Sequence, residues 1–349
     1  MSEPRTSSMV DWDFAVSVGT RLAGDGPVVS RTEASDAVTE LRDGARRSTD
    51  LVRNFTGLDA PDDTAPVLVV DRPGWIRANV DGFARVVSPL MSKLEEKKGA
   101  PSPLTQAVGS RVTAAEVGGL LGFLGGKVLG QFDPFHEPHG RLLLVAPNIV
   151  HVERELEVDS ADFRLWVCLH EETHRVQFTA VPWLRDHLHS EIEALVGGFG
   201  SDTSALLSDG LKRVGDLLRG ADDVSLIDLF STPAQREVVD RVTGVMSLLE
   251  GHADVVMDGA GPEVIASLPD IRAKFNRRRK GVGVLDKVLR RLLGLDQKMA
   301  QYRDGAGFVN AVVDQVGMDG FNAVWSEPAH LPSKEEIGDP AAWVRRVHG

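Results

Sequence analysis

The segment that most constrains this chain is WVCLHEETHRVQF, residues 166–178. His170 and His174 stand four residues apart, so on an α-helix their imidazole rings project from one face, about one turn apart. At that spacing two neutral ring nitrogens can bind one Zn²⁺ at about 2.0–2.1 Å, because the helix keeps both rings in place. Glu171 directly follows the first histidine and would point toward the water that zinc activates, as a general base. The segment therefore predicts a helix built around a metal site.

This pattern is specific enough to carry a hypothesis. With ten histidines in 349 residues, a chance match occurs about once in fifty such chains. The residues before it are mostly apolar, which predicts a helix buried on one side: Phe163, Leu165, Trp166, Val167 and Leu169. The alternative is a helix with two hydrogen-bonded histidines beside surface glutamates and no metal.

A catalytic zinc site needs a third protein ligand and leaves one position open for water. The best candidate lies in MSLLEGHADVVMD, where Glu250 and Asp254 are again four residues apart. Glu250 is expected to bind the metal, while Asp254 accepts the free ring N–H of His170 or His174 and so orients that ring. The alternative for this segment is a polar helix stripe that binds no metal.

Other residues are weaker candidates for the same site. His252 points about 200° away from the face of Glu250; it is a possible ligand, or a donor to a tetrahedral intermediate. Tyr302 is the only tyrosine, and a phenol near a metal can donate to a developing oxyanion, although a packing role is the alternative. His187 and His189 are expected in solvated loops. The basic run Lys274–Lys280 fits either a solvated helix face or a contact with an acidic partner or substrate.

Charge and cysteine content exclude several classes of protein. The net charge of −12 disfavours a nucleic-acid binder, because an acidic surface repels phosphate. A single cysteine, Cys168, excludes an intramolecular disulfide and any multi-cysteine zinc site. The polar, acidic start of the chain carries no secretory signal, so a cytoplasmic location is expected. Oligomeric state does not follow from these features.

The longest apolar stretch, Val117–Gly126, is too short for a membrane span, which needs about 18 apolar residues. Gly118, Gly122 and Gly126 recur at every fourth residue, on one face of a helix. This spacing indicates either a close helix–helix contact or a buried helix or glycine-rich turn of a soluble protein.

Apolar periodicity predicts a mainly α (α+β) protein. The segments with helical spacing are Ser35–Phe55, Asp81–Leu94, Ala161–Leu188, Thr203–Leu218, Pro233–Met257 and Val284–Leu295. Two short apolar runs, Val67–Val70 and Leu142–Val145, are strand candidates, so a small sheet among many packed helices is expected. We expect a mostly helical region over residues 1–140 and a catalytic region over residues 141–349, or one integrated domain.

At WVCLHEETHRVQF, MSLLEGHADVVMD and QYRDGAGFV the sequence resembles the zincin-like metallopeptidase type 2 family of actinobacteria. Members are described only as candidate hydrolases, and one branch is labelled as associated with biosynthesis of coenzyme F-420, which implies no chemistry. The resemblance implies a zincin-like fold, a metal pair at His170 and His174, a base at Glu171 and a third ligand at Glu250. One residue departs from metallopeptidase helices: Glu172 is charged where they usually carry uncharged residues.

The function expected from these features is that of a zinc-dependent hydrolase, a metallopeptidase of gluzincin type acting on a peptide or small amide. A zinc-dependent hydrolase of non-peptide amides or esters is one alternative. A metal-stabilised binding or scaffold protein without turnover is another; a side chain in the fourth coordination position would favour it, whereas an open cleft would favour hydrolysis.

Overall fold

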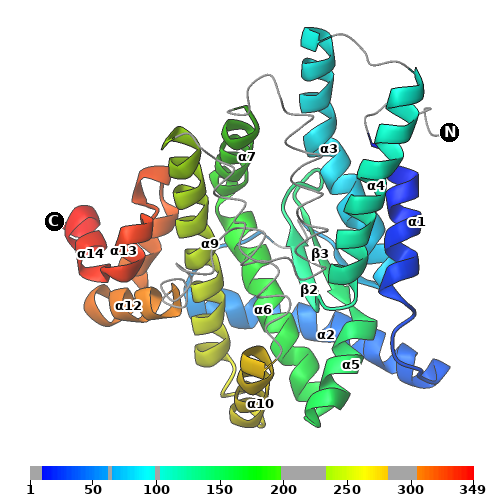
Figure 1. Cartoon of the computed structure of the whole chain (residues 1–349). Coiled ribbons are helices and arrows are strands. Elements are labelled where there is room, and N and C mark those ends of the chain that lie inside the picture. The colour runs from blue at the N-terminus through cyan, green and yellow to red at the C-terminus, as the bar shows by residue number, and fades with distance from the viewer. Residues whose placement is uncertain (1–9, 62–64, 99–102, 198–232, 282–304) are drawn as a thin grey trace.

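Helices dominate the structure, and a small sheet lies among them (Figure 1). The computed structural model describes residues 10–61, 65–98, 103–197, 233–281 and 305–349. Its α-helices are α1 (Trp12–Ala23), α2 (Arg31–Thr56), α3 (Arg72–Lys98), α4 (Pro103–Gly125), α5 (Ala146–Leu156), α6 (Ser160–Ala180), α7 (Pro182–Gly197), α9 (Pro233–Ala260), α10 (Leu268–Gly281), α12 (Gly305–Phe321), α13 (Lys334–Gly338) and α14 (Pro340–His348). Two 3₁₀ turns, Asn322–Trp325 and Pro328–His330, follow α12. The expected fold class is confirmed.

The sheet has three strands: β1 (Val67–Val70), β2 (Gly130–Asp133) and β3 (Arg141–Val145), in the order β1-β3-β2. β3 is central and buried throughout; it pairs parallel to β1 and antiparallel to β2. Both expected strands are present, whereas β2 was not expected because GQFD lacks a run of β-branched residues. The sheet combines strands from both sides of residue 140. The expected division of the chain into residues 1–140 and 141–349 stays a prediction.

Helix α6 occupies the centre of the molecule, between α9 on one side and the sheet on the other, with α2 crossing beside it (Figure 1). Its start is set by Asp159, whose side chain accepts a hydrogen bond of 2.9 Å from the backbone N–H of Asp162. The expected helix Ala161–Leu188 is in fact two helices, because Pro182 cannot continue α6 and opens α7 instead.

The charge of Glu172 is explained by the contact of α6 with α2. Glu172 is fully buried, and one carboxylate oxygen accepts hydrogen bonds of 2.7 Å from Arg175 and 2.7 Å from the Thr49 hydroxyl of α2. On a helix Glu172 projects about 200° from His170, so it faces away from the histidine pair. Its role is in helix packing.

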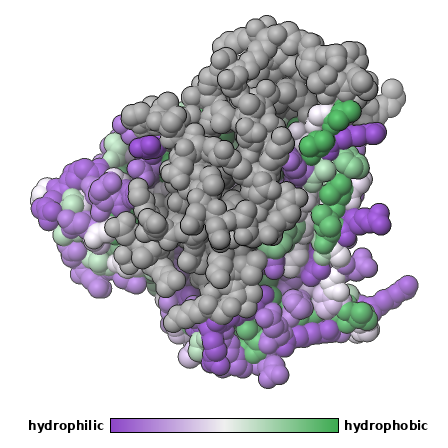
Figure 2. Space-filling view, in the orientation of Figure 1, coloured by the Kyte–Doolittle hydropathy of each residue, from purple (hydrophilic) through white to green (hydrophobic). Residues whose placement is uncertain are grey.

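The glycines of α4 provide a close contact with α1. A Cβ atom at Gly118 would lie 2.5 Å from the Ala15 carbonyl oxygen, and one at Gly122 would lie 2.7 Å from the Gly19 carbonyl oxygen. Of the two interpretations of this spacing, the structure supports the helix–helix contact. Apolar side chains are exposed along the edge that α1 and α4 form, as the green surface in Figure 2 shows; they include Phe14, Leu22, Val108 and Val112.

None of the described helices is both long enough and apolar enough to cross a membrane. Three features expected from the sequence lie outside the described residues: the helices Thr203–Leu218 and Val284–Leu295, and the side chain of Tyr302.

Candidate metal centre

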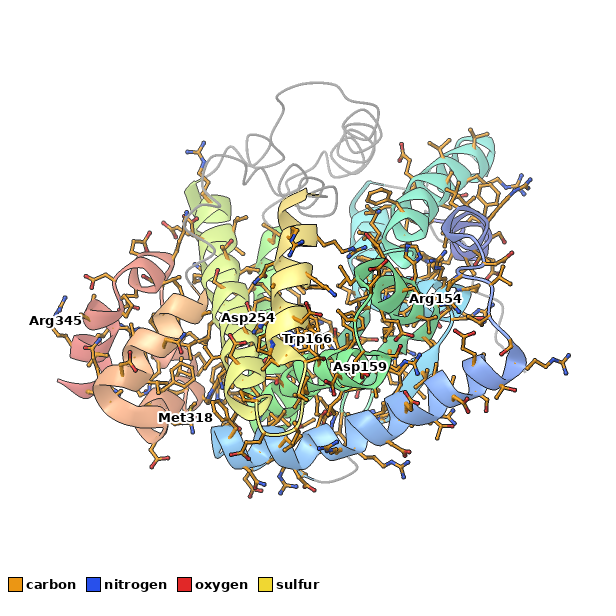
Figure 3. The ribbon with its side chains drawn as sticks, turned by 90° about the horizontal axis from the view of Figure 1, so that it is seen from below. Arg154, Asp159, Trp166, Asp254, Met318 and Arg345 are labelled. Carbon is orange, nitrogen blue, oxygen red and sulfur yellow. The ribbon has the colours of Figure 1, made fainter. Side chains whose placement is uncertain are left out.

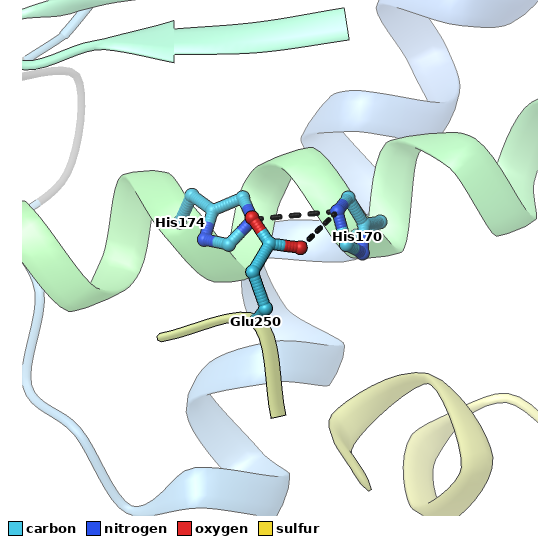
Figure 4. Close-up of side chains that lie close together, drawn as sticks. All are labelled: His170, His174 and Glu250. Atoms are coloured by element: carbon cyan, nitrogen blue, oxygen red, sulfur yellow. Dashed lines mark hydrogen bonds and ion pairs between the residues drawn. The ribbon is translucent and has the colours of Figure 1, made fainter. Parts of the chain in front are cut away.

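Three polar side chains from two crossing helices meet at one point (Figure 4). His170 and His174 come from α6 and Glu250 comes from α9. The two Nε2 atoms are 3.3 Å apart, and the Glu250 carboxylate oxygens lie 3.7 Å from Nε2 of His170 and 3.6 Å from Nε2 of His174. The side chains are 26%, 12% and 55% exposed respectively, so the group opens toward the Glu250 side.

These separations match the donor spacing of a zinc site. Tetrahedral zinc with bonds of about 2.0–2.1 Å places its ligand atoms about 3.3–3.4 Å from one another. The observed separations are close to that spacing: 3.3 Å between the two nitrogens, 3.7 Å from His170 to one Glu250 oxygen and 3.6 Å from His174 to the other. Two imidazoles and one carboxylate also form a donor set used by catalytic zinc. The three side chains therefore fit a zinc ion chemically and geometrically.

Glu171 is buried against the sheet, next to this group. A Cβ atom at Gly130 of β2 would lie 2.5 Å from Cγ of Glu171, so the strand passes directly over this side chain. Burial, with a smaller contribution from the negative charge of Glu250, raises the pKa of Glu171 well above its usual range. Within the described part of the chain, no hydrogen bond engages its carboxylate. Such a carboxylate is suited to accept a proton.

The outer ring nitrogens of the two histidines have different partners. Nδ1 of His174 lies 2.9 Å from Oε1 of Gln177, which accepts its N–H. Nδ1 of His170 lies 3.2 Å from Sδ of Met257, a weak acceptor on α9. In both rings the other nitrogen, Nε2, therefore faces the point where the two histidines meet Glu250.

The structure corrects the role expected for Asp254. Its carboxylate is paired with Arg272 of α10 at 3.1 Å, and the Asp254 carbonyl accepts a second hydrogen bond of 2.9 Å from the same guanidinium. Figure 3 shows Asp254 on the side of α9 that faces α10. Arg272 also lies over the ring of Trp166. Asp254 therefore joins α9 to α10, while Gln177 contacts the ring of His174 and Met257 contacts the ring of His170.

His252 is also placed differently from the expectation. It is fully buried, and its ring lies 5.4 Å from the rings of both Phe321 and Trp325. Burial, with a smaller contribution from His174, lowers its pKa to about 3. Its Nδ1 is 2.9 Å from Nε2 of Gln177, whose Oε1 in turn lies 2.9 Å from Nδ1 of His174.

Among the described residues, two further histidines and the basic run lie outside this group. His187 and His189 lie on α7, which corrects the expected loop. The basic run lies on α10, where Lys274 pairs with Asp270 and Arg278 with Glu155. The side chains of Lys274 and Arg278 are only 30% and 26% exposed, because Lys274 also donates to the Glu157 carbonyl and Arg278 contacts the same segment.

Sequence reasoning missed Gln177, Met257 and Gly130. Gln177 continues the histidine spacing as the third residue of an i, i+4, i+7 stripe, which was the available signal. Met257 stands seven residues after Glu250, and Gly130 depends on a strand that was not expected.

Known proteins resemble the chain over nearly its whole length. A family described as zincin-like metallopeptidase matches residues 10–344. Among solved structures, the chain is similar to a protein from Chloroflexus aurantiacus described as a "putative hydrolase with a novel fold". The two share 30% sequence identity with a TM-score of 0.73, and the match covers 97% of this chain and 99% of the other. No curated protein matches the chain.

Proposed function

Because the chain belongs to the family of zincin-like metallopeptidases, we propose that it is a zinc-dependent hydrolase that cleaves peptide bonds. His170, His174 and Glu250 would hold the metal, and Glu171 would act as the general base. The observation that carries this proposal is the meeting of three side chains, two imidazoles and one carboxylate, whose nearest polar atoms are 3.3–3.7 Å apart, beside a buried carboxylate. The description of the Chloroflexus aurantiacus protein as a hydrolase supports the same reaction class.

Each residue has a task in this mechanism. A zinc ion supplies Lewis acidity, which lowers the pKa of water and polarises a carbonyl oxygen. The Glu171 carboxylate accepts the proton of the attacking water and later gives it to the leaving amine. Its raised pKa makes it a stronger base than an exposed glutamate. Gly130 excludes water from one side of Glu171, because its backbone lies directly against that side chain.

A peptide substrate is favoured by the position of β2. Among the described strands, β2 is at the edge of the sheet and pairs only with β3. An extended peptide can add to such an edge through backbone hydrogen bonds. Because Gly130 of β2 touches Glu171, a peptide on this edge would pass next to the base. A glutamate as third ligand on a later helix corresponds to the gluzincin type.

We propose the cytoplasm as its compartment, since the single cysteine, Cys168, is a buried free thiol.

The test compares zinc-loaded protein with chelator-stripped protein on a library of quenched fluorescent peptides, and on a panel of p-nitrophenyl esters and anilides. We expect peptide cleavage by the loaded protein alone. Glu171→Gln should retain zinc and lose about 10²–10⁴-fold in turnover. The matched control is Glu263→Gln, which makes the same change at an exposed residue after α9 and should leave turnover unchanged.

Two results would contradict the proposal. Hydrolysis of esters or anilides without peptide cleavage would indicate a hydrolase of non-peptide substrates. Tight zinc binding without turnover on any probe would indicate a metal-stabilised binding protein.

A further inference from the structure

We infer that Gln177 is a positioning residue of the metal centre: one amide group fixes the ring tautomer of His174 and holds the backbone beside Glu250 against α6. The inference rests on the proposed metal site. Gln177 is fully buried and lies one turn after His174 on α6.

The first contact is with a ligand ring. Oε1 of Gln177 lies 2.9 Å from Nδ1 of His174. A carbonyl oxygen can only accept a hydrogen bond, so Nδ1 carries the proton. A neutral imidazole has one N–H, which leaves a lone pair on Nε2. Nε2 is the atom that lies 3.3 Å from Nε2 of His170 and 3.6 Å from the Glu250 carboxylate. The tautomer that Gln177 selects is therefore the one a metal ligand requires.

The second set of contacts is with α9. Nε2 of Gln177 donates to the Leu249 carbonyl at 3.1 Å and lies 2.9 Å from Nδ1 of His252. Leu249 precedes Glu250 directly and His252 follows it by two residues. The two amide N–H groups thus bind α9 on both sides of the third ligand. One side chain connects a ligand of α6 to the segment that carries the ligand of α9.

The amide can adopt only one orientation here. If oxygen and nitrogen were exchanged, the oxygen would face the Leu249 carbonyl oxygen, and two acceptors would repel each other. The Leu249 carbonyl therefore fixes the direction of the amide, and the direction of the amide fixes the proton of His174. This dependence is specific to an amide, because a carboxylate would accept from His174 but would not donate to α9.

His252 completes this arrangement as an acceptor. With Nδ1 facing the Gln177 amide, the N–H of its neutral ring lies at Nε2. Within the described residues this Nε2 is buried without a hydrogen-bond partner. Buried unsatisfied groups are rare in folded proteins and need an explanation. Here the explanation is that Nδ1 must be unprotonated to accept a hydrogen bond from Gln177, so the ring proton lies on Nε2. This supporting contact replaces the catalytic role of His252 that was expected from the sequence.

The first test is zinc affinity, measured by competition with a chromophoric chelator on the full chain. Gln177→Met removes the amide but keeps a side chain of similar length, and it should weaken zinc binding about 10–100-fold. Gln177→Glu retains the acceptor for His174, so it should recover part of this loss. The control is Thr179→Ala on the same helix, where the hydroxyl donates to the Arg175 carbonyl; its zinc affinity should equal that of the wild type. Wild-type affinity in Gln177→Met would overturn the inference.

The second test reads the tautomer directly and needs no substituted Gln177. The apo-protein is labelled with ¹⁵N-histidine and its ring nitrogens are observed by NMR at about pH 8, where ordinary imidazoles are neutral. The His174 signal is assigned by its loss in His174→Ala. We expect a protonated Nδ1 and an unprotonated Nε2; a protonated Nε2 would overturn the inference. A wild-type protein that binds no zinc would contradict the proposed function, whereas the tautomer of His174 would still decide the role of Gln177.

Discussion

Replacing Gly130 with alanine would add a methyl group where β2 touches the side chain of the proposed base. The new Cβ would lie 2.5 Å from Cγ, 2.6 Å from Cδ and 2.7 Å from Oε1 of Glu171. Carbon atoms in contact are separated by about 3.5–4.0 Å, so one group must move by about 1 Å. Gly130 is paired with Leu144 of the buried strand β3, whereas the Glu171 carboxylate is the end of a side chain. We expect the carboxylate to be the group that moves.

A displacement of about 1 Å in a catalytic group costs about 10²-fold in rate. Gly130→Ala should therefore lower kcat/KM about 10²-fold on a peptide that the wild type cleaves, while zinc content by atomic absorption stays at about one per chain. Gly119→Ala is the matched control, because no atom lies within 4 Å of the position of its Cβ. Activity of Gly130→Ala within twofold of wild type would refute the assignment of Glu171 as the base.

Three further predictions address the ligands, the buried ion pair and the cysteine. His170→Ala and His174→Ala should each lose zinc on dialysis, since each removes one of three ligands; a full equivalent of zinc retained in both would contradict the site. Glu172→Ala should keep its zinc but lower the free energy of unfolding by about 3–5 kcal/mol, because Arg175 stays buried without its partner. A loss below about 1 kcal/mol in urea denaturation would show that the pair is not buried as described. Burial raises the pKa of the Cys168 thiol, so native protein should not react with a disulfide reagent such as DTNB, while unfolded protein should release one equivalent; rapid reaction of the native state would be inconsistent with the structure.

The histidine pair was the part of the proposed site most accessible to sequence analysis. The i, i+4 spacing of His170 and His174 is a property of a single helix, and local geometry alone brings their rings together. Local helix geometry could not place Glu250, because its position depends on how α9 crosses α6. It was found through its chemistry and its own helix face, and the structure brings it to the two histidines.

Asp254 shows where such reasoning fails. Four residues along a helix rotate the side chain by about 40° from Glu250, whereas seven residues rotate it by about 20° in the other direction. The sequence is compatible with either direction of rotation. In the structure it is Met257, and not Asp254, that contacts His170. The competing partner of Asp254 is Arg272, which comes from the next helix after a turn. Its position could not be derived from periodicity.

The fold was predictable to a similar degree. Helical periodicity and the two apolar runs predicted the fold class and the strands β1 and β3. β2 is four residues long, and GQFD has no strand-like alternation, so only its pairing with β3 reveals it. The break between α6 and α7 came from one proline at position 182, within an apolar pattern that otherwise continues.

The most direct test of the metal centre is anomalous diffraction at the zinc edge from crystals of the zinc-loaded protein. We predict one peak per chain between α6 and α9, at about 2.0–2.1 Å from Nε2 of His170 and of His174 and about 2.0–2.2 Å from a carboxylate oxygen of Glu250. A peak at another place in the fold, or a zinc coordinated by the histidines without Glu250, would contradict the account.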